Sequence, residues 1–166
     1  MIKRSNIKLP ALLLALMFVL LPGCAETGTA EISEDVYAAA GDGQIVDIRD
    51  RYTADGELHG SDAGAHVQTL LLDNAEDNER VSSEALFEIS EDANTRLGIT
   101  ASWRQSGETL YVGVASAEGT IYALGLTSGA AHGTIDLSGL PAGEYAVTMF
   151  SSNDADVFAS LSYQIA

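Results

Sequence analysis

The fold is decided by residues 97–126, whose sequence is LGITASWRQSGETLYVGVASAEGTIYALGL. Apolar side chains alternate with small or polar ones over residues 97–103, 110–114 and 122–126, and Gly, Ser and Glu separate the three runs. This period of two is typical of strands that bury one face. The stretch therefore predicts three consecutive β-strands.

The same pattern recurs on both sides of this stretch. With the three runs above it predicts seven strands, at residues 85–89, 97–103, 110–114, 122–126, 135–137, 145–149 and 157–165. Short strands at regular spacing, each with one apolar face, indicate an antiparallel sandwich or barrel. We expect an all-β chain whose core is an antiparallel β-sandwich of about seven strands.

The turns predict how some of these strands pair. A two-residue loop at Ser106-Gly107 would place Trp103 opposite Leu110 in a hairpin. A three-residue turn at 117–119, with Gly119 at positive φ, would place Val114 opposite Tyr122. An immunoglobulin topology would instead cross between sheets at the first turn, so the strand order stays open.

A third hairpin would join the last two strands and place Tyr145 opposite Tyr163. The same register puts Phe150 beside Phe158 on the face away from the core. With Asn153 and Asp154 in the adjoining loop, this aromatic pair is a candidate platform for a glycan or peptide. The alternative is that segment 45–72 packs over the two rings.

Residues 140–145 have the sequence LPAGEY and lie between two predicted strands. They resemble the tyrosine corner of immunoglobulin-like and fibronectin-type sandwiches. The resemblance implies that the Tyr145 hydroxyl turns back to upstream backbone. We assign structural roles to Tyr145, Trp103, Gly119 and Gly143.

The N-terminus reads as an export signal. Residues 1–8 contain the basic side chains of a signal peptide, and an apolar run of 13 residues follows at 9–21. This run is shorter than the roughly 20 residues that span a bilayer. The run ends in Leu21-Pro22-Gly23-Cys24, which resembles the lipobox of bacterial lipoproteins. The resemblance implies a diacylglyceryl group on Cys24, the only cysteine, with fatty acids such as palmitate. Ordinary cleavage after Ala25 is the alternative.

These features divide the chain into four segments. Residues 1–23 are the signal peptide, and residues 24–44 are an acidic, Gly- and Ala-rich segment expected to be a flexible tether. Residues 45–80 form an irregular segment with one or two strands that pack on the core. Residues 81–166 form the sandwich.

The charge is strongly asymmetric. Lys3, Arg4 and Lys8 leave with the signal peptide, so five of the eight basic residues remain against all 24 acids, a net charge of −19. Such a surface argues against nucleic acid and against docking on anionic lipid through a basic patch.

Catalytic motifs are absent from the sequence. Gly60-Ser61-Asp62-Ala63-Gly64 does not place its serine at the centre of a nucleophile elbow, and no lysine follows the signal peptide. The three histidines (His59, His66 and His132) lack the spacing of a zinc site. We therefore expect no enzyme activity and no required cofactor.

Calcium is the one metal with a candidate site. Two segments supply oxygen ligands: Asp73, Asn74, Asp77 and Glu79 with Glu76, and Asn153, Asp154 and Asp156. Neither matches the EF-hand pattern, so calcium stays an alternative to no cofactor.

The sequence predicts a lipoprotein on the extracytoplasmic side of the cell membrane or outer membrane. It would contact the bilayer through acylated Cys24 and act as a non-catalytic binding, adhesion or envelope-structural module, with an envelope protein or glycan as partner. One alternative is an accessory subunit that docks through an apolar face formed by Leu70, Leu72, Phe150 and Phe158. Another is a hydrolytic or metal-dependent envelope enzyme.

Overall fold

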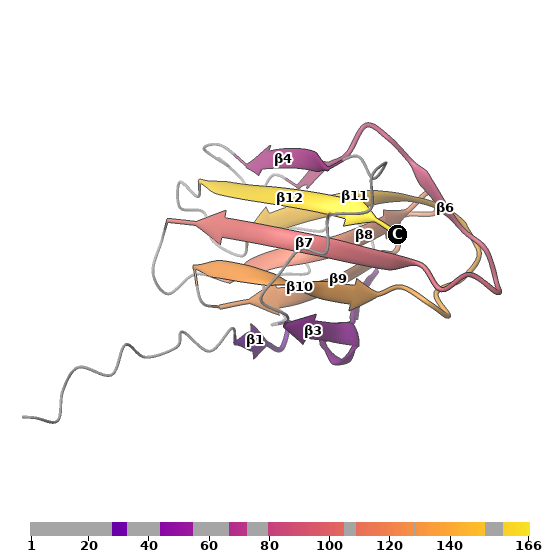
Figure 1. Cartoon of the computed structure of the whole chain (residues 1–166), viewed down its shortest axis with the longest axis horizontal. Helices are drawn as coiled ribbons and strands as arrows, with labels where there is room; N and C mark the ends of the chain where they lie inside the picture. The colour runs from indigo at the N-terminus through magenta and orange to yellow at the C-terminus, as the bar shows by residue number, and fades with distance from the viewer. Residues whose placement is uncertain are drawn as a thin grey trace, which may run out of the picture.

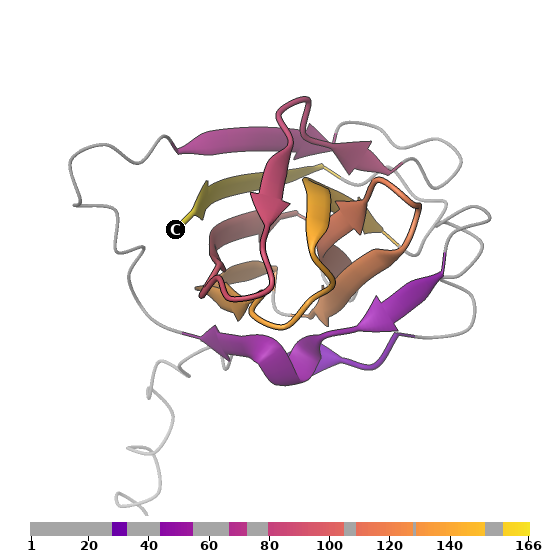
Figure 2. The ribbon, with the colours of Figure 1, turned by 90° about the vertical axis from the view of Figure 1, so that its right-hand side faces the viewer.

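The computed structural model describes residues 28–32, 44–54, 67–72, 80–104, 109–127, 129–151 and 158–166. These residues form two sheets packed face to face, with almost all strands antiparallel to their neighbours (Figure 1; Figure 2). The predicted all-β sandwich is confirmed, and all seven predicted strands are present.

The first sheet, sheet A, has the strand order β1-β9-β8-β11-β5, with β2 also on β9 and β6 also on β11. Its strands are β1 (Thr29–Ala30), β2 (Ile45–Asp47), β5 (Val81–Ser82), β6 (Phe87–Ile89), β8 (Leu110–Ser116), β9 (Ile121–Leu126) and β11 (Gly143–Ser151). Sheet B has the order β3-β10-β7-β12-β4. Its strands are β3 (Tyr52–Ala54), β4 (Gln68–Leu72), β7 (Arg96–Trp103), β10 (Ala130–Asp136) and β12 (Ala159–Ile165).

The core lies between the sheets and is built by the alternation that the sequence shows. Leu97, Ile99 and Leu161 from sheet B meet Val112 and Val147 from sheet A, and all are completely buried. Apolar burial of this kind is the main force that holds a sandwich together.

Sheet A is also buried on its outer face, which the period-two pattern did not indicate. Ile45, Tyr111, Ile121, Ala123 and Phe150 form a second apolar cluster there. The rings of Tyr111 and Phe150 stack with centroids 5.2 Å apart.

One of the three predicted hairpins is confirmed. Strands β8 and β9 pair with Val114 opposite Tyr122, and Gly119 in their turn has a φ of +92°. In the first predicted hairpin, Trp103 instead pairs with Ala159 in sheet B, whereas Leu110 belongs to sheet A.

The last predicted hairpin is also wrong. Tyr145 pairs with Phe87 and Ser116 in sheet A, and Tyr163 pairs with Ile99 and Gln68 in sheet B. The chain crosses between sheets after β7 and again after β11. A register derived from loop length is valid only when both strands lie in one sheet, and here they do not.

The described N-terminal residues wrap one edge of the sandwich. β1 pairs with β9, although it lies inside the predicted tether. β2 and β3 belong to different sheets, since β2 pairs with β9 in sheet A and β3 with β10 in sheet B. The short 3-10 helix η1 (Arg49–Arg51) carries the chain between them, as Figure 2 shows.

This wrap depends on one close approach. Gly133 in β10 has no side chain, and a Cβ placed there would lie 2.4 Å from the Tyr52 ring of β3. The Tyr52 hydroxyl donates a hydrogen bond to the His132 carbonyl oxygen at 2.8 Å. Glycine at this position therefore lets β3 close the edge of sheet B.

The sandwich has two ends, and each takes its name from one core aromatic residue. The Trp103 end holds Trp103, Arg104, Thr127, Gly129 and Phe158; in Figure 1 it is the left-hand end, where β7 and β4 terminate. The Tyr145 end holds residues 90–95, 116–120 and 137–145. No helix within the described ranges is long and apolar enough to cross a membrane.

Candidate binding surface

The outer face of sheet B carries rows of hydroxyl groups. In one row Thr69, Ser162, Thr100 and His132 lie side by side on four strands, and the next row holds Leu71, Ser160, Ser102 and Ala130. We call these two rows the hydroxyl face. Neighbouring strands lie about 4.8 Å apart, and residues two apart on one strand about 6.7 Å apart, so polar groups repeat on a regular lattice.

Hydrogen bonds hold these side chains in place. Ser102 and Ser160 share a hydroxyl–hydroxyl bond of 2.9 Å, and Thr69 and Ser162 share one of 3.3 Å. His132 Nδ1 lies 3.2 Å from the Thr100 hydroxyl. Each hydroxyl both donates and accepts, so it retains capacity for a ligand after one such bond.

The hydroxyl face contains no carboxylate, lysine or arginine. On the strands of sheet B the charged side chains are Arg96 and Asp136, which are register partners at the Tyr145 end. The Ser138 hydroxyl and backbone N–H hydrogen-bond to the Asp136 carboxylate and lower its pKa, with Arg96 and Arg51 adding smaller effects. The charged side chains on the strands of sheet B therefore lie at the Tyr145 end and outside the two rows.

At the Trp103 end the face leads into an open groove of about 510 Å³. Its lining includes Ser102, Ser160 and Arg104, together with Leu71 and Phe158. Leu71 is 65% exposed and Phe158 47% exposed, so both offer apolar surface to a ligand.

The structure separates the two phenylalanines of the predicted platform. Phe150 is completely buried in sheet A against Tyr111, whereas Phe158 is exposed beside sheet B. The predicted aromatic pair is therefore wrong, because β11 and β12 belong to different sheets. Phe158 alone remains a candidate ligand contact.

The predicted docking face of an accessory subunit does not form. Leu70 and Leu72 point into the core, and Phe150 packs in the second cluster. Of the four residues of that face only Phe158 is exposed, and Leu71, between the two buried leucines of β4, is exposed beside it.

Several predicted site residues lie outside the described residues. They are Cys24, the histidines His59 and His66, the calcium candidates Asp73, Asn74, Asp77 and Glu79 with Glu76, and Asn153, Asp154 and Asp156. Leu72, the last described residue before the first acidic segment, is the register partner of Ala159, which lies three positions after Asp156. Within the described ranges no three His, Cys, Asp or Glu side chains lie close enough to hold a metal ion.

The tyrosine-corner contact is present. The Tyr145 hydroxyl donates to the Pro141 carbonyl oxygen at 2.7 Å, and burial raises the pKa of this phenol, with Tyr122 and Glu118 adding to the shift. Trp103 is 6% exposed in the core, and Gly143 opens β11 with a φ of +156°. These contacts fit the structural roles assigned to the residues, although Trp103 also lines the groove at its end of the sandwich.

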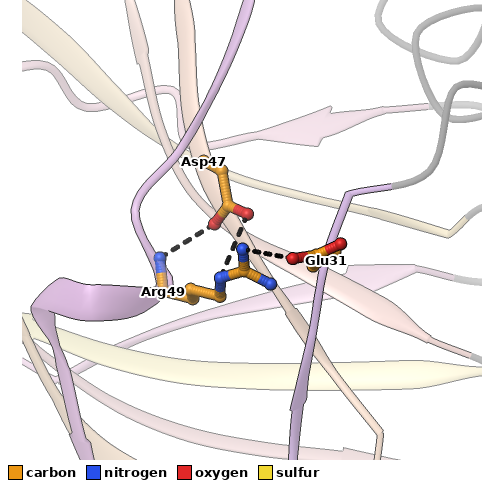
Figure 3. A network of polar contacts seen from close by, with 3 residues as sticks. All are labelled: Glu31, Asp47 and Arg49. Carbon is orange, nitrogen blue, oxygen red and sulfur yellow. Dashed lines mark hydrogen bonds and ion pairs between the residues drawn. The ribbon is translucent and has the colours of Figure 1, made fainter.

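A small ion-pair network lies at the N-terminal edge (Figure 3). Arg49 contacts Glu31 at 2.8 Å and Asp47 at 3.5 Å, and its backbone N–H donates to Asp47. Glu31 directly follows β1, so the network ties the first described segment, 28–32, to residues 44–54.

The hydroxyl face was not singled out in the sequence, although its signal is there. Ser and Thr occupy alternate positions in two strands, at Thr100 and Ser102 and at Ser160 and Ser162, and a third strand adds Thr69. In the sequence alone, these positions are typical of residues that face solvent. Only the pairing of the strands shows that they form rows.

Neither models of known protein families nor curated proteins give a match to this chain.

Proposed function

We propose that this chain is a lipoprotein anchored at Cys24 on the extracytoplasmic side of a membrane, and that its β-sandwich is a non-catalytic binding module. We propose further that its ligand is a neutral, hydroxyl-rich polymer, a polysaccharide, which lies across the hydroxyl face.

One observation carries this proposal: the hydroxyl face is uncharged in a chain with 24 acids. A neutral ligand would meet no unpaired charge there, whereas a charged ligand would have to give up hydration without gaining an opposite charge. The hydroxyl rows supply donors and acceptors, and Phe158 offers an apolar surface for a sugar ring.

Co-sedimentation with insoluble neutral polysaccharides tests the proposal. Cellulose, chitin and a β-1,3-glucan are the probes, and at least one should retain the chain. Ser160→Glu places a charge within the second row and should weaken retention at least tenfold, and Phe158→Ala should weaken it several-fold. Ala117→Glu adds the same charge in the exposed turn at the Tyr145 end and should leave binding unchanged.

Two results would count against the proposal. One is that none of the three polymers retains the wild-type chain. The other is that Ser160→Glu and Ala117→Glu bind equally well, which would place the binding surface elsewhere.

A further inference from the structure

We infer that the ligand of the hydroxyl face is a single, extended, β-1,4-linked chain of neutral sugars that crosses the strands of sheet B. This inference rests on the proposed function, to which it adds the linkage of the sugars and the direction in which the chain lies. The sugar chain runs from β4 over β12 and β7 to β10, with one ring over each strand (Figure 1).

The first row of the hydroxyl face has one polar side chain on each of these strands. In strand order they are Thr69, Ser162, Thr100 and His132. Thr69 and His132 are exposed, and the two residues between them are half-buried, so all four are accessible to a ligand. A ligand that crosses the strands therefore meets a polar group at every strand.

Hydrogen bonds divide this row into two pairs. The hydroxyls of Thr69 and Ser162 lie 3.3 Å apart, and His132 Nδ1 lies 3.2 Å from the Thr100 hydroxyl. A polar pair therefore recurs after two strands, a distance of about 9.6 Å. A ligand that contacts both pairs in the same way has a chemical repeat close to this length.

Extended β-1,4-linked sugars have such a repeat. The two bonds that continue the chain leave each ring equatorially from opposite sides, so each sugar advances the chain by about 5 Å, close to the strand spacing of about 4.8 Å. Successive rings face opposite ways, so the chemical repeat is two sugars and matches two strands. Chains with β-1,3 or α-1,4 linkages join their rings at an angle and coil, so they do not stay in step with the strands.

The spacing along the strands does not fit such a chain. Thr100 and Ser102 are two positions apart on β7, about 6.7 Å, which is longer than one sugar and shorter than two. Further along β7 and β10 lie Arg96 and Asp136, four positions beyond Thr100 and His132. A neutral chain laid along the strands would remove water from these charges without replacing it, which disfavours that direction.

The second row of the hydroxyl face borders the same path. Ser160 and Ser102 share a hydrogen bond at its centre, and Leu71 and Ala130 add apolar side chains at its two ends. Phe158 lines the groove together with Ser160, so its ring lies beside the sugar over β12. Sugar rings have polar edges and apolar faces, and this row offers contacts to both.

The twist of the sheet favours a single sugar chain over a crystalline polymer surface. Neighbouring strands are rotated by roughly 20 to 25° relative to each other, so the polar side chains turn gradually about the direction of the row. A single chain follows this turn by a small rotation at each glycosidic bond. The flat face of a polymer crystal cannot follow it and would contact only part of the row.

Soluble oligosaccharides test the linkage. The full chain, purified in a detergent that contains no sugar, is titrated calorimetrically with β-1,4-linked oligomers of glucose and of N-acetylglucosamine. In at least one series the affinity should rise at least tenfold from two to four sugars, because four strands carry the row. From four to six sugars it should rise about threefold at most, since a longer oligomer only gains alternative registers. The β-1,3- and α-1,4-linked glucose tetrasaccharides should bind at least tenfold more weakly than the better β-1,4-linked tetrasaccharide.

Charges at the two ends of the first row test the direction. Thr69→Asp on β4 and His132→Asp on β10 lie three strand spacings apart, about 14 Å. Each should weaken binding of the β-1,4-linked tetrasaccharide at least tenfold and that of the disaccharide about twofold, because a disaccharide still fits the unaltered pair. Asn94→Asp adds the same charge at an exposed residue of the Tyr145 end and should change neither affinity. A loss of folding would instead weaken both oligosaccharides alike.

The outcomes separate this inference from the proposed function. The linkage is wrong if a β-1,3- or α-1,4-linked tetrasaccharide binds as tightly as the β-1,4-linked one. The direction is wrong if two and four sugars bind equally, or if both end variants bind the tetrasaccharide as the wild type does. Retention on an insoluble polymer without binding of any oligosaccharide also overturns the inference, and in all these cases the proposed function stands. If neither polymers nor oligosaccharides bind, the proposed function fails and the inference fails with it.

Discussion

At the residue scale, one hydrogen bond at the tyrosine corner stabilises the start of β11. Tyr145 is 2% exposed, and its hydroxyl bonds to the Pro141 carbonyl oxygen. Tyr145→Phe removes the donor, leaves that carbonyl oxygen without this donor and should destabilise the fold by about 1 kcal/mol. Denaturant unfolding followed by Trp103 fluorescence measures the change. An unchanged midpoint would show that the corner contributes nothing to stability.

The lowered pKa of Asp136 predicts the direction in which stability changes with pH. Its pKa lies below the ordinary value of 3.8 because the folded chain hydrogen-bonds the ionised carboxylate through Ser138. The resulting stabilisation is complete above pH 3.8 and is lost as the pH falls through the lower folded pKa. In Ser138→Ala the carboxyl should titrate at higher pH than in the wild type, as NMR of the Asp136 side chain would show. Equal titration curves would contradict the assignment.

Ser151 is a buried side chain that the fold does not use. Its hydroxyl has no hydrogen-bond partner among the described residues, and the residue is 2% exposed. Removing an unsatisfied buried hydroxyl costs no hydrogen bond and relieves a desolvation penalty of about 1 kcal/mol or more. Ser151→Ala should therefore unfold at the same or a higher denaturant concentration. A lower midpoint would mean that the hydroxyl has a partner.

At the level of elements, the N-terminal edge is held by contacts of modest strength. Arg49 is 34% exposed and Glu31 81% exposed, and exposed ion pairs contribute little to global stability. Arg49→Ala should therefore shift global unfolding only slightly but open residues 28–32 locally. Limited proteolysis should cut there several times faster than in the wild type. Arg96→Ala, an arginine on sheet B, is the matched control and should leave that cleavage rate unchanged.

The elements also show what the sequence can predict. Each apolar alternation gave a real strand, and the turn at Gly119 gave the correct β8–β9 register, because a tight turn forces neighbouring strands into one sheet. After Trp103 and after Ser151, the connections are also short, but each leads the chain from one sheet to the other. Sequence spacing cannot distinguish a turn within one sheet from a crossing between sheets. The predicted Phe150–Phe158 pair was wrong because it relied on a hairpin register between strands of different sheets.

The hydroxyl face was missed for a related reason. Ser102 and Ser160 are 58 positions apart in sequence and meet only because β7 and β12 are neighbours. Contacts between residues so far apart in sequence depend on the order of strands in the sheet. The three predicted hairpin registers did not give that order. The buried outer face of sheet A was missed because β2 brings Ile45 onto β9 from outside the regular pattern.

At the scale of the whole molecule, the surplus of acids opposes the stability that apolar burial supplies. A net charge of −19 on residues 24–166 opposes compaction by self-repulsion, and salt screens that repulsion. The Debye length falls from about 30 Å at 0.01 M to about 3 Å at 1 M salt, so the repulsion between most carboxylate pairs is removed over this range. The melting temperature should rise by roughly 4 °C, equivalent to about 1 kcal/mol.

The same experiment separates general screening from a calcium site. Thermal unfolding is measured in NaCl and in CaCl₂ at matched ionic strength, and screening alone predicts shifts of similar size that grow gradually with concentration. Binding at Asp73, Asn74, Asp77 and Glu79 would instead give a larger shift that saturates at millimolar calcium, because a ligand that binds only the folded chain stabilises it by mass action. We expect the gradual response, and a saturating one that Asp77→Asn abolishes would assign calcium to that segment.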